Sequence, residues 1–279
     1  MESWMTIPMI NLATVTAMMT VGWIFSVLRH NVTIVDSLWG VGFVLVAGVT
    51  FWTGNGFTDR SLLILCLTAG WGLRLAGYLT WRNWGQNEDH RYGQWREKSG
   101  QRFWFVSLFK VFWLQALFLW SISLVLQKAQ LSAEPSRLTR LDILGAIVWA
   151  TGFVFESVGD WQLARFKANP ANRGRVMDRG LWAWSRHPNY FGEFLIWWGF
   201  FLVALATPGG WWTVVSPVII SLVLLKMTGV PLTEAALKAQ PDQRIGKACP
   251  VCQVGKRLHL TRFLGGRGKN VLVFSMYLA

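Results

Sequence analysis

Long apolar runs alternate with short polar segments along most of this chain. Seven runs have the length of about 20 residues that a helix needs to cross a bilayer, and they occupy residues 7–28, 34–53, 61–81, 103–126, 141–165, 188–206 and 211–229. No soluble domain, internal repeat or low-complexity segment separates them. The pattern predicts an all-α polytopic membrane protein with about seven transmembrane helices, formed by one domain over residues 1–237 and followed by a basic tail over residues 238–279.

The composition agrees with a membrane protein. Hydrophobic residues make up 53% of the chain and charged residues 15%, and there are 19 tryptophans. Many tryptophans lie near the ends of the runs, which is typical of an interfacial belt, although bulky packing is the alternative for any one of them. Those near the ends are Trp39, Trp81, Trp84, Trp104, Trp182, Trp184, Trp211 and Trp212.

The formal net charge of +13 would indicate nucleic acid binding in a soluble protein, but here the basic residues are sorted by loop, so we expect no nucleic acid partner. With seven spans, one side carries Arg29, the basic loops 82–102 and 166–187 and the tail. The other side carries Arg60, Lys128, Arg137 and Arg140. The positive-inside rule then places the N-terminus outside and both basic loops in the cytoplasm. The first run lacks a basic leader and a small-residue cleavage site, so we interpret it as a span.

The sixth run opens with the sequence Ser-Arg-His-Pro-Asn-Tyr-Phe-Gly-Glu. Pro188 is tolerated at the first position of a helix, where an N–H has no intrahelical partner, so we expect the helix to begin there. Asn189 and Glu193 then lie one turn apart on one face. The N–H groups at the helix start, with Arg186 and His187 just before them, form an anion-binding site. The segment predicts a charged cofactor beside a lipid-like substrate.

Ionisable side chains inside the runs are few, because a charge at mid-bilayer costs at least about 2.5–3.5 kcal/mol on insertion scales. They are Asp36, Arg74, Lys110, Glu156, Asp160 and Glu193. Glu156, Asp160 and Lys167 share one stripe of the fifth helix. A salt bridge between helices, such as Arg74 with Asp160, is the structural alternative, and Lys110 is expected to snorkel.

The two basic loops also contain Asn, Asp, Gly and Tyr among their arginines, over residues 82–92 and 167–180. This mixture suits recognition of phosphate, ribose and amide groups, whereas positive-inside topology alone requires only Lys and Arg. We therefore expect a nucleotide cofactor to bind from the cytoplasm.

The chain resembles the bacterial branch of the steroid 5-alpha-reductase family in residues 71–75, Arg82-Asn83, Asp160 with Lys167 and, above all, residues 180–193. The resemblance extends from about residue 36 to residue 237. It implies a seven-helix oxidoreductase of the bacterial inner membrane that binds NADPH from the cytoplasmic side. Such an enzyme reduces the C4–C5 double bond of a 3-oxo-Δ4 steroid. After residue 237 the tail departs from the family's pattern.

The resemblance also implies roles for individual residues. It gives Glu193 a catalytic role and implies cofactor contacts from Asn83, Asp160, Lys167, Arg175 and Asn189. We add Arg74, Arg186 and His187 to the cofactor set because of their positions. The family's carbonyl-polarising glutamate in the second helix has no identical counterpart here, and Asp36 is the nearest acid.

These residues are consistent with enone reduction. The carbonyl oxygen gains enolate charge and needs a donor in a dry site, and a protonated Asp36 or Glu193 would be that donor. No Gly-x-Gly-x-x-Gly follows a predicted strand, so helices and loops must bind the cofactor.

Cys249 and Cys252 have half of a zinc-site spacing without a second pair, so we expect neither a metal nor a disulfide framework.

Two other functions fit parts of the sequence. The Arg-His-Pro-x-Tyr-x-Gly helix start also resembles membrane methyltransferases that act on isoprenylated cysteine or phospholipid head groups with S-adenosylmethionine. A non-catalytic sterol-binding or transport protein is the third hypothesis, and it gives Asn189 and Glu193 no role. The physiological substrate and the oligomeric state have no signal in the sequence.

Overall fold

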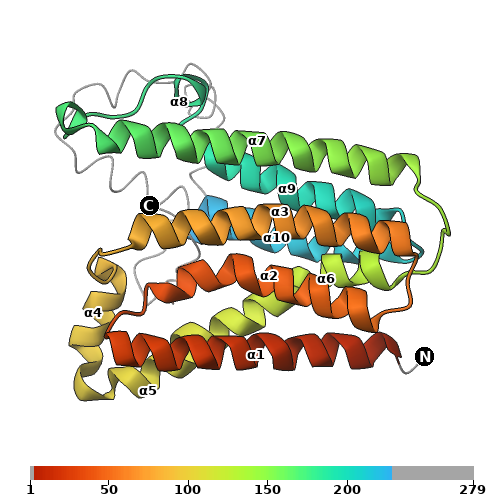
Figure 1. Ribbon diagram of the computed structural model, residues 1–279, viewed down its shortest axis with the longest axis horizontal. Coiled ribbons are helices and arrows are strands. Elements are labelled where there is room, and N and C mark those ends of the chain that lie inside the picture. The colour runs from red at the N-terminus through yellow and green to blue at the C-terminus, as the bar shows by residue number, and fades with distance from the viewer. Residues whose placement is uncertain (1–2, 228–279) are drawn as a thin grey trace, which may run out of the picture. The chain divides into compact units, whose positions relative to one another are not determined.

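The computed structural model describes residues 3–227, and every regular element within them is a helix (Figure 1). The α-helices are α1 (Ser3–Arg29), α2 (Ile34–Thr53), α3 (Thr58–Asn83), α4 (His90–Ser99), α5 (Phe103–Ser107), α6 (Leu114–Leu131), α7 (Arg140–Ala168), α8 (Leu181–Trp184), α9 (Pro188–Leu205) and α10 (Val215–Leu222). All seven predicted runs are helical over their described residues except for residue 206, just after α9 ends, so the all-α fold is confirmed. The predicted tail, with Cys249 and Cys252, lies outside the described residues.

Five helical segments of the described chain are long and apolar enough to cross a membrane: Met5–Arg29, Ile34–Thr53, Thr58–Asn83, His90–Leu131 and Arg140–Ala168. A shorter apolar helix covers Gly210–Leu225, and α9 has 18 residues. The protein is therefore an integral membrane protein. The segment His90–Leu131 has 42 residues, about twice what a bilayer requires, so its polar first part, α4, is free to extend beyond the apolar layer.

The chain divides into two compact units, and helices α7 and α9 each contribute residues to both. The first unit comprises Met1–Trp149 and Trp197–Ile219. The second comprises Ala150–Ile196 and Ile220–Ala279.

The first unit has an aromatic core. Helices α1, α2 and α3 run side by side in Figure 1, and Trp39, Trp71 and Trp197 are fully buried among the helices of this unit. The ring of Phe43 meets that of Trp197 edge-on, with centroids 4.8 Å apart, and Trp71 meets Trp197 in the same way at 5.5 Å. Such pairs add about 0.5–1.5 kcal/mol each beyond the area they bury.

The structure corrects the interfacial belt at one tryptophan. Trp39 is fully buried, and its indole N–H donates to the side-chain oxygen of Gln115, so at this position the packing alternative holds. The predicted positions that are largely exposed, as a belt requires, are Trp81, Trp84, Trp104, Trp184 and Trp211.

A buried ion pair joins α3 to the start of α7 within the first unit. Arg60 Nε lies 2.8 Å from Asp142 Oδ1, and both side chains are almost fully inaccessible to solvent. Arg60 also donates to the backbone carbonyls of Pro135 and Arg137. The backbone N–H and the hydroxyl of Thr139 both donate to Asp142 Oδ2. The connection between α6 and α7 is thereby fixed against α3.

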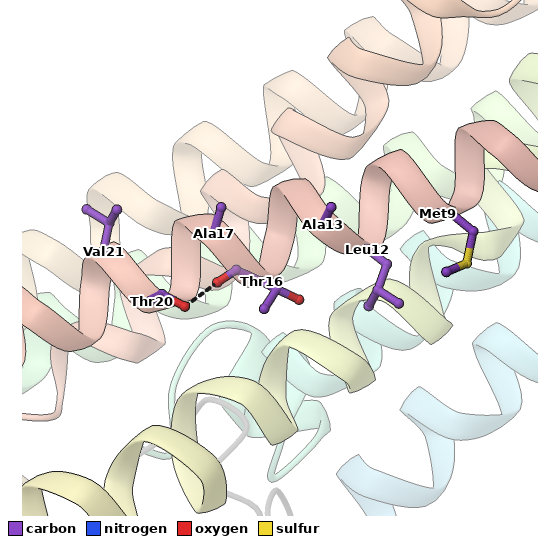
Figure 2. Close-up of a pocket in the computed structure, with 7 residues that line it drawn as sticks. All are labelled: Met9, Leu12, Ala13, Thr16, Ala17, Thr20 and Val21. Atoms are coloured by element: carbon purple, nitrogen blue, oxygen red, sulfur yellow. Dashed lines mark hydrogen bonds between the residues drawn. The ribbon is translucent and has the colours of Figure 1, made fainter.

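One face of α1 is hollowed into an apolar groove (Figure 2). The Thr20 hydroxyl is engaged within the protein, because it donates to the backbone carbonyl of Thr16 and accepts from the indole N–H of Trp113. The groove is lined by Met9, Leu12, Ala13, Thr16, Ala17, Thr20 and Val21. Since α1 is a candidate membrane span, this face suits contact with lipid chains.

Candidate functional site

In the second unit, α7 and α9 approach each other at glycines. A Cβ atom added to Gly152 would lie 2.5 Å from the carbonyl oxygen of Gly192, and one added to Gly192 would lie 2.4 Å from the backbone nitrogen of Glu156. Farther along, a Cβ on Gly159 would lie 3.2 Å from the backbone nitrogen of Asn189. The two backbones therefore meet without intervening side chains, as small residues permit in membrane helices.

This close approach buries four polar side chains that the sequence had singled out. Glu156, Asp160, Asn189 and Glu193 are each at most 7% exposed. The Asn189 amide donates from Nδ2 to Asp160 Oδ1 over 3.2 Å. Because a carboxylate oxygen only accepts hydrogen bonds, the nitrogen of the amide must face Asp160 and its oxygen must point away. The Oδ1 atom of Asn189 is buried and has no hydrogen-bond partner. The predicted acidic stripe of α7 and the polar pair of α9 thus meet in one buried cluster.

Helix α9 begins at Pro188, as predicted. Just before it, the Ser185 hydroxyl accepts from the backbone N–H of His187, and the His187 ring stacks on Tyr190 with centroids 5.2 Å apart. The approach to α9 is also tied to α7, because the indole N–H of Trp182 donates to the carbonyl of Gly159 over 3.0 Å. Arg186 and His187 are half-buried at this helix start.

The predicted basic cofactor contacts of the second unit lie outside the buried cluster. Lys167, in the last turn of α7, and Arg175, in the following loop, are both exposed. The loop is ordered by its own bonds, since the side-chain amide of Asn172 donates to the carbonyl of Phe166. These positions suit contact with a ligand at the membrane surface and not with the buried acids.

The first unit contains a second polar region, around Asp36. This carboxyl group is 1% exposed, so Asp36 is not a solvated residue at the membrane boundary. The Tyr92 hydroxyl, from α4, donates to Asp36 Oδ1 over a long 3.4 Å, and Arg91 is the strongest positive charge acting on Asp36. The sequence had placed residues 82–92 in a loop only by their composition and gave Tyr92 no separate role.

Helix α4 is held in place by its N-cap. Asp89 accepts from the backbone N–H of Arg91 and pairs with the Arg91 guanidinium at 2.6–2.8 Å. Burial raises the pKa of Asp89, but the hydrogen bonds from Arg91 outweigh burial, so the pKa lies below its ordinary value. An Asp immediately before a helix is a recognised N-cap signal, and it would have located α4 from the sequence.

A second acid clamps α4 to the connection between α1 and α2. Glu88 accepts from the backbone N–H of Val32 over 2.8 Å and from Arg96 at 2.7 and 2.9 Å. The Thr33 hydroxyl accepts from the backbone N–H of Asp89. The surroundings of Asp36 are therefore built from two segments far apart in sequence.

The remaining predicted cofactor residues of the first unit lie on α3. Arg74 is half-buried within this helix. Asn83 ends it, and its side-chain oxygen accepts from Arg82 Nε over 3.2 Å. The Nδ2 atom of Asn83 is buried without a hydrogen-bond partner.

Comparisons with known proteins cover both regions. A family model described as "Protein of unknown function (DUF1295)" matches residues 22–245. An uncharacterized protein of Schizosaccharomyces pombe (strain 972 / ATCC 24843), C594.04c, is 28% identical over 207 residues, which cover 64% of this chain and 59% of that protein. The chain thus spans well under two thirds of the length of this curated relative. No solved structure matches the chain.

Proposed function

Because this chain belongs to the DUF1295 family, which carries no assigned function, we propose one from its own residues. It is a membrane oxidoreductase that uses NADPH to reduce the C4–C5 double bond of a 3-oxo-Δ4 steroid. The observation that carries this proposal is the buried amide of Asn189, which donates to Asp160 and leaves its oxygen without a partner.

The residues of the second unit fit a nicotinamide cofactor. A buried acceptor such as Asn189 Oδ1 needs an N–H donor, and the carboxamide of a nicotinamide has one. NADPH supplies the hydride when it is bound. Glu193 lies one turn along α9 and is 5% exposed, so the surrounding helices shield this end of the site from water. Arg186, His187 and the N–H groups at the start of α9 would hold an anionic group of the cofactor.

The exposed basic residues fit the phosphates. Lys167 and Arg175 would contact them from the cytoplasmic side, which is where positive-inside topology places this loop. Substitution of either by alanine should weaken NADPH binding and make the remaining affinity less dependent on salt. An unchanged NADPH affinity would leave these residues with a topological role alone.

The Asp36 region of the first unit fits the substrate carbonyl. The enolate that forms during reduction needs a hydrogen-bond donor in a dry site, and a protonated Asp36, which is buried and accepts from the Tyr92 hydroxyl at Oδ1, would be that donor. Asp36→Asn should therefore lower turnover and leave NADPH affinity unchanged. Equal turnover in this variant and the wild type would remove Asp36 from the reaction.

The proposal is tested by mass spectrometry of testosterone incubated with the detergent-purified protein and either NADPH or S-adenosylmethionine. We expect a gain of two hydrogens with NADPH. A gain of one methyl group with S-adenosylmethionine would instead establish a methyltransferase. Binding of testosterone without any change in mass would support a sterol-binding or transport protein.

A further inference from the structure

Helix α5 and the π-helical segment that follows it, η2 (Leu108–Trp113), carry a row of exposed aromatic side chains. Trp104, Phe105, Phe109 and Trp113 are each between 39% and 53% exposed. Consecutive rings of this row meet edge-on, with centroids 5.7, 5.0 and 4.9 Å apart. The row is about 13 Å long along the helix, close to the depth of about 15 Å of one leaflet's hydrocarbon layer. The proposed function leaves this apolar row unused.

The aromatic row lies against α1 and meets its apolar groove. The indole N–H of Trp113 donates to the hydroxyl of Thr20 over 3.1 Å, and Thr20 lines the groove shown in Figure 2. At the other end of the row, the indole N–H of Trp23 donates to the backbone carbonyl of Trp104 over 2.8 Å. The groove has a volume of about 630 Å³, within the range of about 300–1,000 Å³ of sites that hold small molecules. The row and the groove together form one apolar surface along α1.

Three exposed cations lie at the Trp104 end of this surface. Arg29 is in the last turn of α1, and Lys98 is in the last turn of α4. Arg102 stands two residues before Trp104. Among residues 84–113, all of which the structure describes, Glu97 is the exposed acid. The exposed charge at this end is therefore positive.

Arg96 brings the segments that carry these cations together. Its guanidinium group donates to the backbone carbonyl of His30 over 3.3 Å and lies 4.5 Å from the centroid of the Phe103 ring. Its charge is balanced by Glu88 at 2.7 Å. Figure 1 shows α4 and α5 at the end of α1. The cations thus share one end of the first unit, although they come from separate segments of the chain.

Helix dipoles and membrane topology do not account for this arrangement. A cation in the last turn of a helix interacts favourably with the helix dipole, which covers Arg29 and Lys98. Arg102 instead directly precedes α5, whose first turn has no acid, and there the dipole disfavours a cation. Positive-inside topology requires cations on one side of the membrane but no aromatic row or groove beside them.

We propose that this surface binds an anionic phospholipid. The phosphate of its head group contacts Arg29, Lys98 and Arg102, which supply charge-assisted hydrogen bonds. One acyl chain lies along the aromatic row and reaches the groove of α1 at Thr20. Every residue involved belongs to the first unit, and the inference is independent of the proposed reductase activity.

The test is native mass spectrometry of the full-length protein in detergent, titrated with dioleoyl phosphatidylglycerol. Dioleoyl phosphatidylcholine has the same chains without net charge and is titrated separately. The head-group variant combines Lys98→Gln with Arg102→Gln. Its matched control combines Arg137→Gln with Arg140→Gln, two exposed cations in and just after the connection between α6 and α7.

A second pair of variants examines the acyl chain. Ala17→Leu fills the groove with an apolar side chain, because Ala17 is exposed and lines it. Ala150→Leu is the matched control, since Ala150 is an exposed alanine of another candidate span, α7.

We expect the wild type to bind phosphatidylglycerol at least tenfold more tightly than phosphatidylcholine. Loss of Lys98 and Arg102 should weaken phosphatidylglycerol binding by about 30-fold, if each cation contributes as a basic residue near an anionic membrane surface does. The control double variant should stay within about twofold of wild type. Ala17→Leu should weaken both lipids several-fold, whereas Ala150→Leu should leave both unchanged.

Three outcomes would overturn the proposal. Equal affinity of the wild type for the two lipids would leave the cations with a topological role alone. An equal loss in the two double variants would show attraction by net charge and no defined site. Displacement of the lipid by glycerol 3-phosphate at an equal concentration, or unchanged binding in Ala17→Leu, would exclude the row and the groove from the site.

Discussion

The ion pair between Arg60 and Asp142 gives the sharpest prediction about stability. Both side chains are fully buried, so solvent does not screen their interaction. In Arg60→Met, the Asp142 carboxylate keeps only its bonds from Thr139. In Asp142→Leu, the guanidinium keeps two backbone carbonyls but has no counter-charge. Each single substitution therefore strands one buried charge.

The expected loss is large. Removal of one partner of a buried ion pair typically costs about 3–5 kcal/mol, whereas replacement of both by apolar residues is often close to neutral. One kcal/mol shifts Tm by about 2–4 °C for a chain slightly smaller than this one, so each single variant should lose roughly 6–20 °C. The double variant Arg60→Met with Asp142→Leu should recover part of that loss.

The assay is thermal unfolding of the detergent-purified protein, followed by tryptophan fluorescence. Arg140→Met is the matched control, because Arg140 begins the same helix as Asp142 and is exposed. It should unfold within about 2 °C of wild type, since surface substitutions usually stay within about 0.5 kcal/mol. A loss below about 2 °C in both single variants, or a double variant as unstable as the sum of the two, would refute the reasoning.

Three further predictions concern function, packing and pH. Asn189→Ala and Glu193→Gln should each lower turnover. For Asn189→Ala we expect a loss of about 10- to 100-fold, the size of a hydrogen bond to a charged group such as the one between Asn189 and Asp160. Near-normal turnover in both variants would exclude this face of α9 from the site. Gly192→Ala should lower the melting temperature, because the new Cβ would lie 2.4 Å from the backbone nitrogen of Glu156. Gly48→Ala is the control and should not lower it, because no atom lies within 4 Å of a Cβ at that position. Equal melting temperatures for the two variants would contradict the close approach of α7 and α9. The lowered pKa of Asp89 means that its stabilising contribution is complete above about pH 4 and is lost as pH falls through that lowered pKa. Hydrogen exchange of α4 amides between pH 2 and 6 should show this loss, and Asp89→Asn should abolish the pH dependence.

The sequence predicted what is encoded locally. Continuous apolar runs located the five candidate spans of residues 3–227, and Pro188 located the start of α9 to the residue, because its missing N–H restricts it to the first turn. The period of 3.6 residues correctly placed Glu156 with Asp160, and Asn189 with Glu193, each pair on one buried face.

Contacts between distant segments could not be predicted in this way. Arg60 was assigned to a membrane side, but its partner Asp142 is 82 residues away, and no local pattern relates them. The burial of Asp36 depends on Tyr92, which is 56 residues away on a polar helix without an apolar run. The sequence also gave no sign that Lys167 and Arg175 are exposed. A cation at a helix end or in a loop has the same local sequence pattern whether its side chain is buried or exposed.

The buried ion pair also constrains how the protein is made. A ribosome synthesises Arg60 long before Asp142, so α3 enters the translocon while its guanidinium has no counter-charge. Arg60 lies in the first turn of α3, at the end of this span, so we expect that turn to stay at the membrane surface until α7 emerges, because an unpaired arginine drawn to the bilayer centre would cost about 2.5–3.5 kcal/mol. Biogenesis of the N-terminal helices is therefore completed only when the fifth predicted span arrives, and truncation before residue 142 should leave a nascent chain that the cell's quality control recognises.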